Sequence, residues 1–533
     1  MKSAPSSPLR SFPSISSIIL ILLVAAAIGM ATACGTSPTP PKFSGNTTVV
    51  VLASSTANDQ LFQFPVTLQS LTLTSQSGQT VSLLATPASD EFMHLNGHVE
   101  PLATVSIPQG IYTSAAAMVS QAIPACAGQS AGSLLMDEAL GDLNGPTAAS
   151  FEPEQPITVT GSTMGLVLDL QVSETAPFSG GCSESLTNAV TITPTFSLTA
   201  ISIAAQPTNS SNGKVLGVEG LISSVSADGS GFTAGALYSV SEGASAPTWQ
   251  VSVSSGTVFQ GVGSAAGLTV GLPIDMDLVI EPDGSLLATR VAVYDADTTN
   301  LSLAFGPPLV IYPSGAYQAV YPVMDALEVE QEGQLSSLIG LYGDLNAATL
   351  QISGQLANLQ SLPFTATFNS ANMVDGQNIL FSTHAPPEVF EPLTTITLLP
   401  QTIDGTVSAI SSEGNFTTYT VTLAPYDLFP NLAVQPGQTT LLTNPNTVVV
   451  YSDSNTQLLN TQTLAAGNTF RFYGLVFNDN GTLRMDCAQV NDGVAFNPPS
   501  NANARPEIGQ AQTIRRVGPA GQQQIVTTVT RTP

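Results

Sequence analysis

The sequence predicts an all-β protein: an N-terminal β-sandwich followed by two or three small antiparallel β-barrel modules. Runs of strand length that are rich in Val, Thr, Ile and Leu recur along the chain, for example at residues 66–74, 165–172 and 470–477. Asp283-Gly284 and Asn480-Gly481 separate such runs, and Asx-Gly pairs supply the positive φ angles that tight hairpins need. The 44 Gly and 38 Pro residues are spread along the whole body, which is typical of many short strands and turns.

The N-terminus has the pattern of an export signal. Lys2 and Arg10 precede an apolar run at residues 18–28, and small residues follow it. Eleven apolar residues are too few to cross a bilayer as a helix. The order of charge, apolar run and small residues predicts a secretory signal peptide over residues 1–33.

The end of this signal resembles that of bacterial lipoproteins, because Ala31-Thr32-Ala33 is followed directly by Cys34. The resemblance implies that Cys34 becomes a lipidated N-terminus and that the protein is held in the cell envelope, at the outer membrane or in the periplasm. Residues 34–44, rich in Pro, would then form a stiff tether. The alternative is an ordinary secreted protein cut at the same bond.

The composition is acidic and poor in charge. Only 9% of the residues are charged, against about a quarter in ordinary soluble proteins. Removal of the signal leaves nine basic residues against 37 acidic ones, a formal charge of −28. Such a potential repels phosphate backbones, so we expect no nucleic-acid partner. We also expect stability to rise as the pH falls from 7 toward about 5, because protonation of carboxylates relieves self-repulsion.

Three cysteines remain after Cys34. Cys126 and Cys182 are predicted to form a disulfide in an oxidising envelope. Cys487 lies in an apolar-alternating run and is expected to be a small buried side chain. The chain has no CxxC or Cys/His spacing of the kind that binds metals, so we expect no metal and no other cofactor.

Residues 45–205 resemble a family of uncharacterised bacterial lipoprotein domains. The matching features are the strand at 66–74, the segment from His94 to Leu102, and the Pro-x-Gly-x-Tyr turn at residues 108–112. The family is similar to prealbumin-like β-sandwiches and has no established activity. The resemblance therefore implies a β-sandwich over residues 45–205 and names no function.

The second half of the chain repeats itself. Three blocks recur in the same order, which indicates two copies of one module, residues 214–297 and 402–493. The pattern resembles another uncharacterised exported module, and small barrels of the OB or SH3 kind suit such strands. The paired blocks are 220–229 with 405–414, 268–271 with 464–467, and 283–286 with 480–483.

The two copies should superpose as antiparallel barrels, each with an Asx-Gly hairpin. Their inward faces should carry the aliphatic residues Ile222, Val225 and Leu286 in the first copy, and Val407, Ile410 and Leu483 in the second. Residues 298–401 are predicted to be a third, diverged module, and residues 494–533 a low-complexity tail.

The histidine and acidic residues, which could in principle bind a metal, are interpreted as ordinary loop and surface residues. His94 and His98 are four residues apart, as two ligands on a helix face would be, but Asn96-Gly97 between them favours a turn. We expect loop histidines with hydrogen-bond partners and no metal. Acidic runs are interpreted as solvated faces; they include Asp90-Glu91, residues 275–277 and residues 328–332.

No catalytic motif is predicted. Gly128-Gln-Ser-Ala-Gly132 matches the nucleophile-elbow pattern but lacks the strand before it that the elbow requires. We therefore expect a lipid-anchored cell-envelope protein with a structural, adhesive or ligand-display role and no enzymatic activity, whose partners are the membrane and an envelope protein or polysaccharide. The alternatives are an extracellular polysaccharide-binding module and a carboxylate-based glycan hydrolase. The single Trp, Trp249, and 6% aromatic residues disfavour both sugar-directed alternatives.

Overall fold

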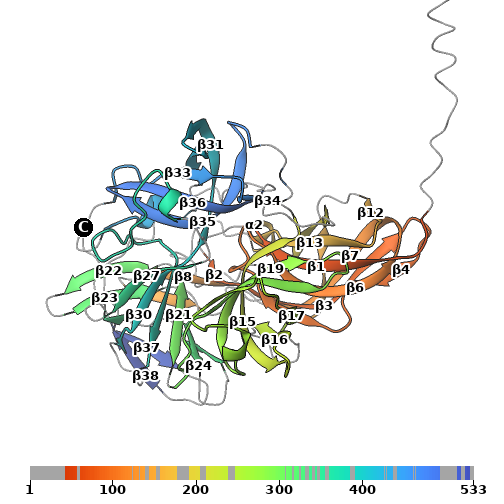
Figure 1. Ribbon diagram of the computed structural model, residues 1–533, viewed down its shortest axis with the longest axis horizontal. Coiled ribbons are helices and arrows are strands. Elements are labelled where there is room, and N and C mark those ends of the chain that lie inside the picture. Colours follow the sequence, from red (N-terminus) through yellow and green to blue (C-terminus); the bar gives the residue numbers. More distant parts are fainter. Residues whose placement is uncertain are drawn as a thin grey trace, which may run out of the picture. The chain divides into compact units, whose positions relative to one another are not determined.

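The structure is a computed structural model, and the chain divides into two units, Met1–Ser44 and Gly45–Pro533. The signal peptide and Cys34 lie outside the described residues, so the description concerns the second unit (Figure 1). The structure describes residues 43–491 and the strand segments 513–517 and 523–527, except for gaps at 57–60, 123, 131–132, 138–142, 144, 152–155, 177–190, 204–211, 238–245, 300, 307, 315–316, 323–325, 330–334, 339–342, 345–347, 355–358, 385–390, 425–426, 428, 436–440, 460 and 462–463.

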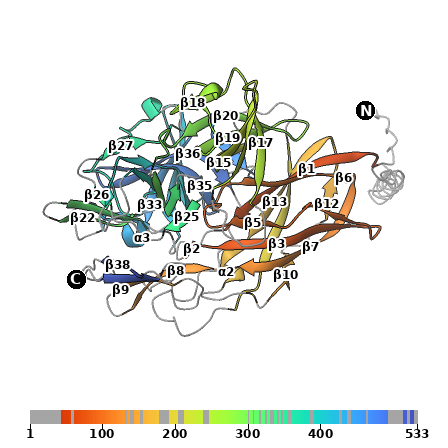
Figure 2. The same cartoon turned by 90° about the horizontal axis from the view of Figure 1, so that it is seen from below.

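The first domain is a β-sandwich, as predicted. One sheet has five strands in the order β11-β14-β13-β1-β6, and the other is built on β10-β7-β3-β4, with β12 paired to β7 and β5 paired to β3. Figure 2 shows the two longest strands of the second sheet, β3 and β7, side by side. The strands are β1 (Asn46–Ser55), β3 (Pro65–Ser75), β4 (Thr80–Ser82), β5 (Ala88–Glu91), β6 (Glu100–Pro108), β7 (Gly110–Ala122), β10 (Thr147–Ala148), β11 (Ser150–Phe151), β12 (Ile157–Val159), β13 (Thr163–Leu170) and β14 (Thr195–Ser202).

Strand β1 is buried on both faces. Side chains alternate across a strand, so Val49 and Val51 enter the sandwich core while Val50 and Leu52 face the other way. Val50 and Leu52 pack in one cluster with residues of the next module, including Ile274. A strand covered on both faces needs a continuous apolar run rather than an alternating one, and β1 has that run.

Smaller elements complete this domain. Strands β2 (Leu61–Gln63), β8 (Ala125–Ser130) and β9 (Ser133–Asp137) form a three-stranded sheet in the order β2-β8-β9. A single-turn helix, α2 (Val172–Thr175), follows β13. Cys126 lies in β8, but its side chain and the whole of Cys182 lie outside the described residues, so the disulfide stays a prediction.

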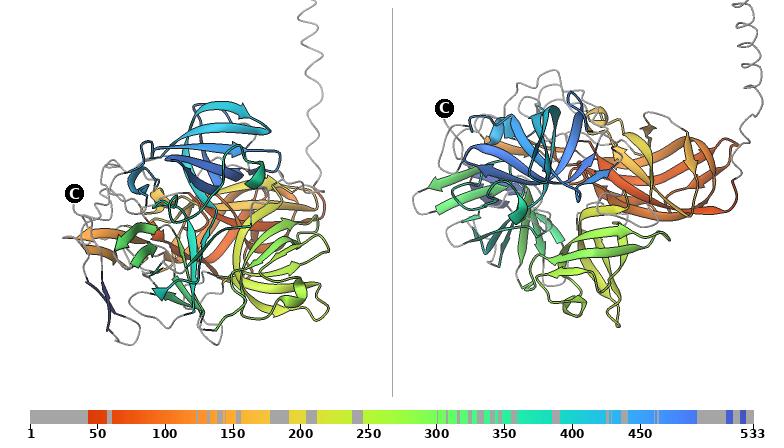
Figure 3. Two further views of the ribbon diagram at one scale, coloured as in Figure 1. Left: turned by 60° about the vertical axis from the view of Figure 1, so that its left-hand side comes forward. Right: turned by 45° about the horizontal axis from the view of Figure 1, so that its top comes forward.

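The two predicted barrel modules share one strand order. The first pairs its strands as β17-β16-β15-β19-β20-β18, and the parallel pair β17–β20 closes it. The second pairs as β33-β32-β31-β35-β36-β34 and closes with β33–β36 (Figure 3). Their strands are β15 (Lys214–Val225), β16 (Gly231–Ala236), β17 (Thr248–Ser252), β18 (Val258–Gln260), β19 (Pro273–Ile280) and β20 (Leu286–Val293), and β31 (Gln401–Glu413), β32 (Phe416–Leu423), β33 (Thr447–Ser452), β34 (Gln457–Leu459), β35 (Thr469–Asp479) and β36 (Thr482–Asn491).

Equivalent glycines make equivalent hydrogen bonds in the two barrels. Gly271 has φ +87° and donates its N–H to the carbonyl of Ile222 at 2.8 Å. Gly467 has φ +89° and donates to Val407, also at 2.8 Å. The repeat that the sequence predicted is therefore confirmed in its strand order and in this contact.

A β-bulge also recurs. It falls at Ser223 in β15 and at Ser408 in β31. Each serine hydroxyl donates across to the neighbouring strand, to the carbonyl of Thr233 at 3.2 Å and of Thr420 at 2.9 Å. A bulge left in the same place in both copies bends the first strand at the same point.

The middle region carries the same strand order a third time. Its main sheet is β25-β24-β21-β28-β30-β27, with β27 and β30 parallel as β18 and β20 are. Its first strand is β21, and the strands of a separate sheet, β22-β23-β26-β29, are inserted along the chain after it. The strands are β21 (Ser302–Gly306), β22 (Pro308–Ser314), β23 (Tyr317–Pro322), β24 (Ala326–Val329), β25 (Leu335–Leu338), β26 (Gly343–Asp344), β27 (Thr349–Ile352), β28 (Ile379–Thr383), β29 (Glu391–Pro392) and β30 (Thr395–Leu398).

The remaining elements are short. They are the 3-10 turns η1 (Ala265–Gly267) and η3 (Leu359–Ser361), the helix α3 (Phe429–Leu432), and a hairpin of β37 (Thr513–Val517) and β38 (Gln523–Thr527) within the predicted tail. None of the helices in the described ranges is long and apolar enough to span a membrane.

The predicted inward faces are mostly buried, with one error. Ile222, Leu286, Val407 and Leu483 are buried in the barrel cores, and Val225 is half-buried. Ile410, however, is 44% exposed. The prediction was wrong there because β31 has no buried face beyond residue 407: every residue from 408 to 413 is exposed. Cys487 is a buried free thiol, as expected.

The repeated glycines generate a prediction. Ala at position 271 or 467 would place a Cβ on backbone held at positive φ, which costs roughly 1–2 kcal/mol. Gly271→Ala and Gly467→Ala should therefore lower the free energy of unfolding by similar amounts in urea denaturation. Gly263→Ala is the matched control, because Gly263 is exposed, has no positive φ and has open space around its Cβ position. Equal losses at positions 263 and 271 would contradict the account.

Candidate functional site

A tight loop between β5 and β6, together with the strand ends beside it, gathers the buried polar side chains of Asp90, Glu91, His98 and Glu100. The loop contains Asn96-Gly97, and Gly97 has φ +75° as the predicted turn requires. A Cβ at Gly97 would come within 2.5 Å of Thr402 in β31, so the loop also needs glycine for close approach. The structure therefore places His94 and His98 on a turn, as expected, and not on a helix.

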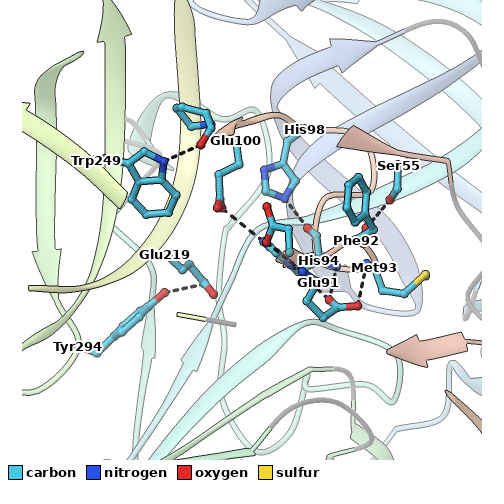
Figure 4. Close-up of polar contacts among 12 residues, drawn as sticks. Ser55, Glu91, Phe92, Met93, His94, His98, Glu100, Glu219, Trp249 and Tyr294 are labelled. Atoms are coloured by element: carbon cyan, nitrogen blue, oxygen red, sulfur yellow. Dashed lines mark hydrogen bonds and ion pairs between the residues drawn. The ribbon is translucent and has the colours of Figure 1, made fainter. Parts of the chain in front are cut away.

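Glu91, the last residue of β5, organises the loop. Its Oε1 accepts hydrogen bonds from the backbone N–H of Phe64 at 2.5 Å and of Met93 at 3.0 Å. Its Oε2 accepts the backbone N–H of His94 at 3.0 Å and faces the His94 Nδ1 at 3.3 Å (Figure 4). The carboxylate thus satisfies buried backbone donors that the turn leaves without strand partners.

His94 lies between two carboxylates. Its Nε2 is 3.4 Å from Glu100 Oε2, on the opposite side of the ring from Glu91. Burial alone would lower the pKa of His94, but the hydrogen bonds to Glu100 and Glu91 outweigh it and raise the pKa well above its usual value. The two carboxylates thus favour the protonated form of His94.

Asp90 and Glu100 are each 1% exposed. Burial raises the pKa of both carboxyl groups, and the negative charge of Glu100 raises that of Asp90 further. Asp90 Oδ2 and Glu100 Oε1 have no hydrogen-bond partner among the described residues. One ligand atom from each of Asp90, His94 and Glu100 lies within 4.8 Å of the other two.

His98 joins this loop to the last barrel. Its Nε2 donates to the carbonyl of His94 at 2.5 Å, and its ring stacks on Tyr473 of β35 with centroids 5.0 Å apart. Burial and the charge of His94 lower the pKa of His98 to about 4, so it is neutral at neutral pH. A neutral ring can stack on Tyr473 without a buried charge.

A second polar cluster lies where β31 and β35 meet the sandwich. Arg471 of β35 donates to the carbonyl of Ser55 and lies 3.4 Å from Asp169 of β13. Asn96 donates to Asp404 at 3.4 Å, and burial raises the pKa of Asp404 to about 6. The Thr402 hydroxyl donates to the carbonyl of Asn96.

The first barrel contacts the sandwich in a similar way. The indole N–H of Trp249 in β17 donates to the carbonyl of Pro101 in β6 at 2.6 Å (Figure 4). Inside that barrel, Arg290 is buried between Asp275 at 2.5 Å and Asp277 at 2.9 Å. Residues 275 and 277, like Asp90 and Glu91, were predicted to be solvated acids and are buried instead.

The polar cluster was missed by sequence reasoning. The signal was present in the order Asp90-Glu91-x-x-His94, followed six residues later by Glu100. These residues are close together in sequence. The burial of the cluster, however, depends on β31 and β35, which lie more than 300 residues further along the chain.

The fold and these contacts define a β-modular protein in which barrels are joined to a sandwich through buried polar side chains. Residues 219–292, which extend from β15 to β20, match DUF5666, a domain of unknown function. No curated protein matches the chain. Among solved structures, a deletion mutant of the single-stranded DNA binding protein from Thermus aquaticus matches at 11% identity, covering 38% of this chain and 97% of that chain, with a TM-score of 0.15. A TM-score this low carries no argument about the function of this chain.

Arg471 provides a test of the junction. Removing one partner of a buried ion pair leaves the other charge without compensation, which costs roughly 3–5 kcal/mol. Arg471→Met should lower the free energy of unfolding by roughly 3–5 kcal/mol, because it leaves the buried Asp169 without its cationic partner. The control is Arg484→Met in the same barrel, whose partner Asp479 is about a quarter exposed. That variant should lose about 1 kcal/mol or less. Equal losses in chemical denaturation would contradict the role of Arg471.

Asp486 provides a test of pH dependence. Burial, and then the charge of Asp453, raise its pKa to about 7, against about 3.9 in an unfolded chain. A raised folded-state pKa gives stability that is complete below pH 4 and is lost as the pH rises through 7. Asp486→Asn should remove this loss and gain roughly 1–2 kcal/mol at pH 8, with no gain at pH 4.

The control for this experiment is Asp283→Asn. Asp283 is fully exposed, and hydrogen bonds from Ser285 lower its pKa. Its substitution should not raise the melting temperature at pH 8. A wild-type melting temperature that falls steadily from pH 8 to pH 5 would show that carboxylate protonation does not stabilise this protein.

Proposed function

We propose that this protein is a lipid-anchored protein of the cell envelope that holds its β-modules in fixed positions for a structural, adhesive or ligand-display role, without enzymatic activity. The observation that carries the proposal is the use of the buried polar side chains. Arg471, His98 and Trp249 each contact a residue of a different domain or module. These polar side chains thus connect the modules to one another.

Buried polar contacts between modules favour one arrangement of the modules over others. Sliding one module against its neighbour would leave the buried Asp169 without its guanidinium or the Trp249 N–H without its acceptor, and each loss costs free energy. An apolar interface would tolerate such sliding much better. A fixed spacing of modules suits a protein that supports or presents something at a distance from its anchor.

The charge of the chain supports attachment by lipid rather than by the protein surface. A formal charge of −28 after removal of the signal disfavours direct contact with anionic lipid headgroups. Acyl chains at Cys34 would supply the attachment, since more than one chain is needed for a stable anchor. The tether at residues 34–44 would then separate the body from the bilayer.

The anchor is tested by metabolic labelling. The full chain with its own signal is expressed in a bacterial host with radiolabelled palmitate, and membranes are separated from soluble protein. The wild type should be labelled and recovered with membranes, and Cys34→Ser should be unlabelled. Cys487→Ser is the matched control and should label normally, because Cys487 is buried and free. A wild-type protein that is unlabelled and soluble, or a labelled Cys34→Ser variant, would disprove the anchor.

A further inference from the structure

We propose that Asp90, His94 and Glu100 bind one divalent transition-metal ion of the zinc class, which fixes the loop between β5 and β6. The candidate ligands come from the end of β5, the loop and the start of β6. All three lie in the sandwich domain within eleven residues of sequence, so one short segment supplies all three ligands.

The first argument is geometric. Ligands about 2.0–2.1 Å from a tetrahedral metal lie roughly 3.4 Å from one another. His94 Nε2 and Glu100 Oε2 are 3.4 Å apart, which is longer than an ordinary hydrogen bond and equals this ligand separation. Asp90 completes a group whose ligand atoms all lie within 4.8 Å of one another, so a contraction of at most about 1.4 Å would bring the third ligand to this separation.

The second argument concerns the ring of His94. A histidine ligand binds metal through one nitrogen and usually donates its other N–H to a carboxylate, which fixes the tautomer. Glu91 Oε2 is 3.3 Å from Nδ1 and accepts that N–H, which leaves Nε2 to face Glu100. Glu91 is itself held by three backbone N–H groups. The carboxylate–histidine arrangement of a metal site is thus already built.

The third argument is independent of the ring and concerns unpaired oxygens. Asp90 Oδ2 and Glu100 Oε1 are buried and have no hydrogen-bond partner in the described part of the chain. Buried carboxylate oxygens are costly unless they are paired or coordinate a metal. Asp90, Glu91 and Glu100 place three carboxyl groups around the ring of His94. A divalent ion would balance the charges of Asp90 and Glu100.

The donor set selects the class of metal. One imidazole nitrogen with two carboxylate oxygens is a set that zinc accepts, with a water in the fourth position. Calcium and magnesium prefer sites made of oxygen alone. Imidazole and carboxylate ligands also suit manganese and iron. Cobalt can serve as a spectroscopic probe of the same site.

Zinc itself is the probe for the test. The purified full chain is stripped with a chelator, and zinc binding is measured by competition with a chromophoric chelator and by elemental analysis. One zinc per chain is expected. His94→Gln and Glu100→Gln should each weaken binding at least 100-fold, and Glu91→Gln should weaken it roughly 10–100-fold. His384→Gln is the control, because His384 also lies against a carboxylate, 3.0 Å from Asp295, but outside the group.

Folding is checked by a second readout. Zinc should raise the melting temperature of the wild type and of His384→Gln, and should not raise that of His94→Gln or Glu100→Gln. Cobalt in the wild type should give the visible absorption of a tetrahedral site, which requires no variant to fold. The proposal is overturned if folded wild-type protein binds no zinc at micromolar concentration, if it binds calcium in preference to zinc, or if the ligand variants bind as the wild type does.

Discussion

The scarcity of positive charge is the constraint on which the structure depends. Between Phe43 and Ala504 the chain has four basic residues, Lys214, Arg290, Arg471 and Arg484. Three of them pair with carboxylates inside or between modules, and Lys214 begins β15 and is largely withdrawn from solvent, so desolvation lowers its pKa. Two of these cations, Arg290 and Arg471, lie where a buried carboxylate would otherwise be uncompensated. The surface is left to neutral polar residues and unpaired acids.

The fold was predictable where local geometry decides it. The glycines at 271 and 467 need positive φ, so they mark equivalent turns even where the surrounding residues differ. Strand alternation predicted most of the barrel cores but failed at Ile410, because β31 is exposed on both faces after Val407. Nothing in the residue types of β31 marks the point at which its burial ends.

The candidate site was predictable only in part, because its burial is long-range. Asn96-Gly97 correctly predicted a turn that carries His94 and His98. Asp90 and Glu91 read as a solvated acidic pair, since the strands that cover their loop are distant in sequence. Thr402 shows this most clearly: it contacts the loop across 306 residues, a separation at which no pattern of spacing carries information.

The contact of Arg471 with Ser55 also sets an order of events during synthesis. The two residues are 416 apart in sequence, so the sandwich leaves the ribosome long before Arg471 can reach it. Until then Asp169 lacks the guanidinium beside it, whereas the outer face of β1, with Val50 and Leu52, is covered as soon as the first barrel has been made. The sandwich thus gains its apolar cover early and its charged partner late. A chain cut short before β35 would keep the first barrel over β1 but would leave the buried Asp169 without its guanidinium.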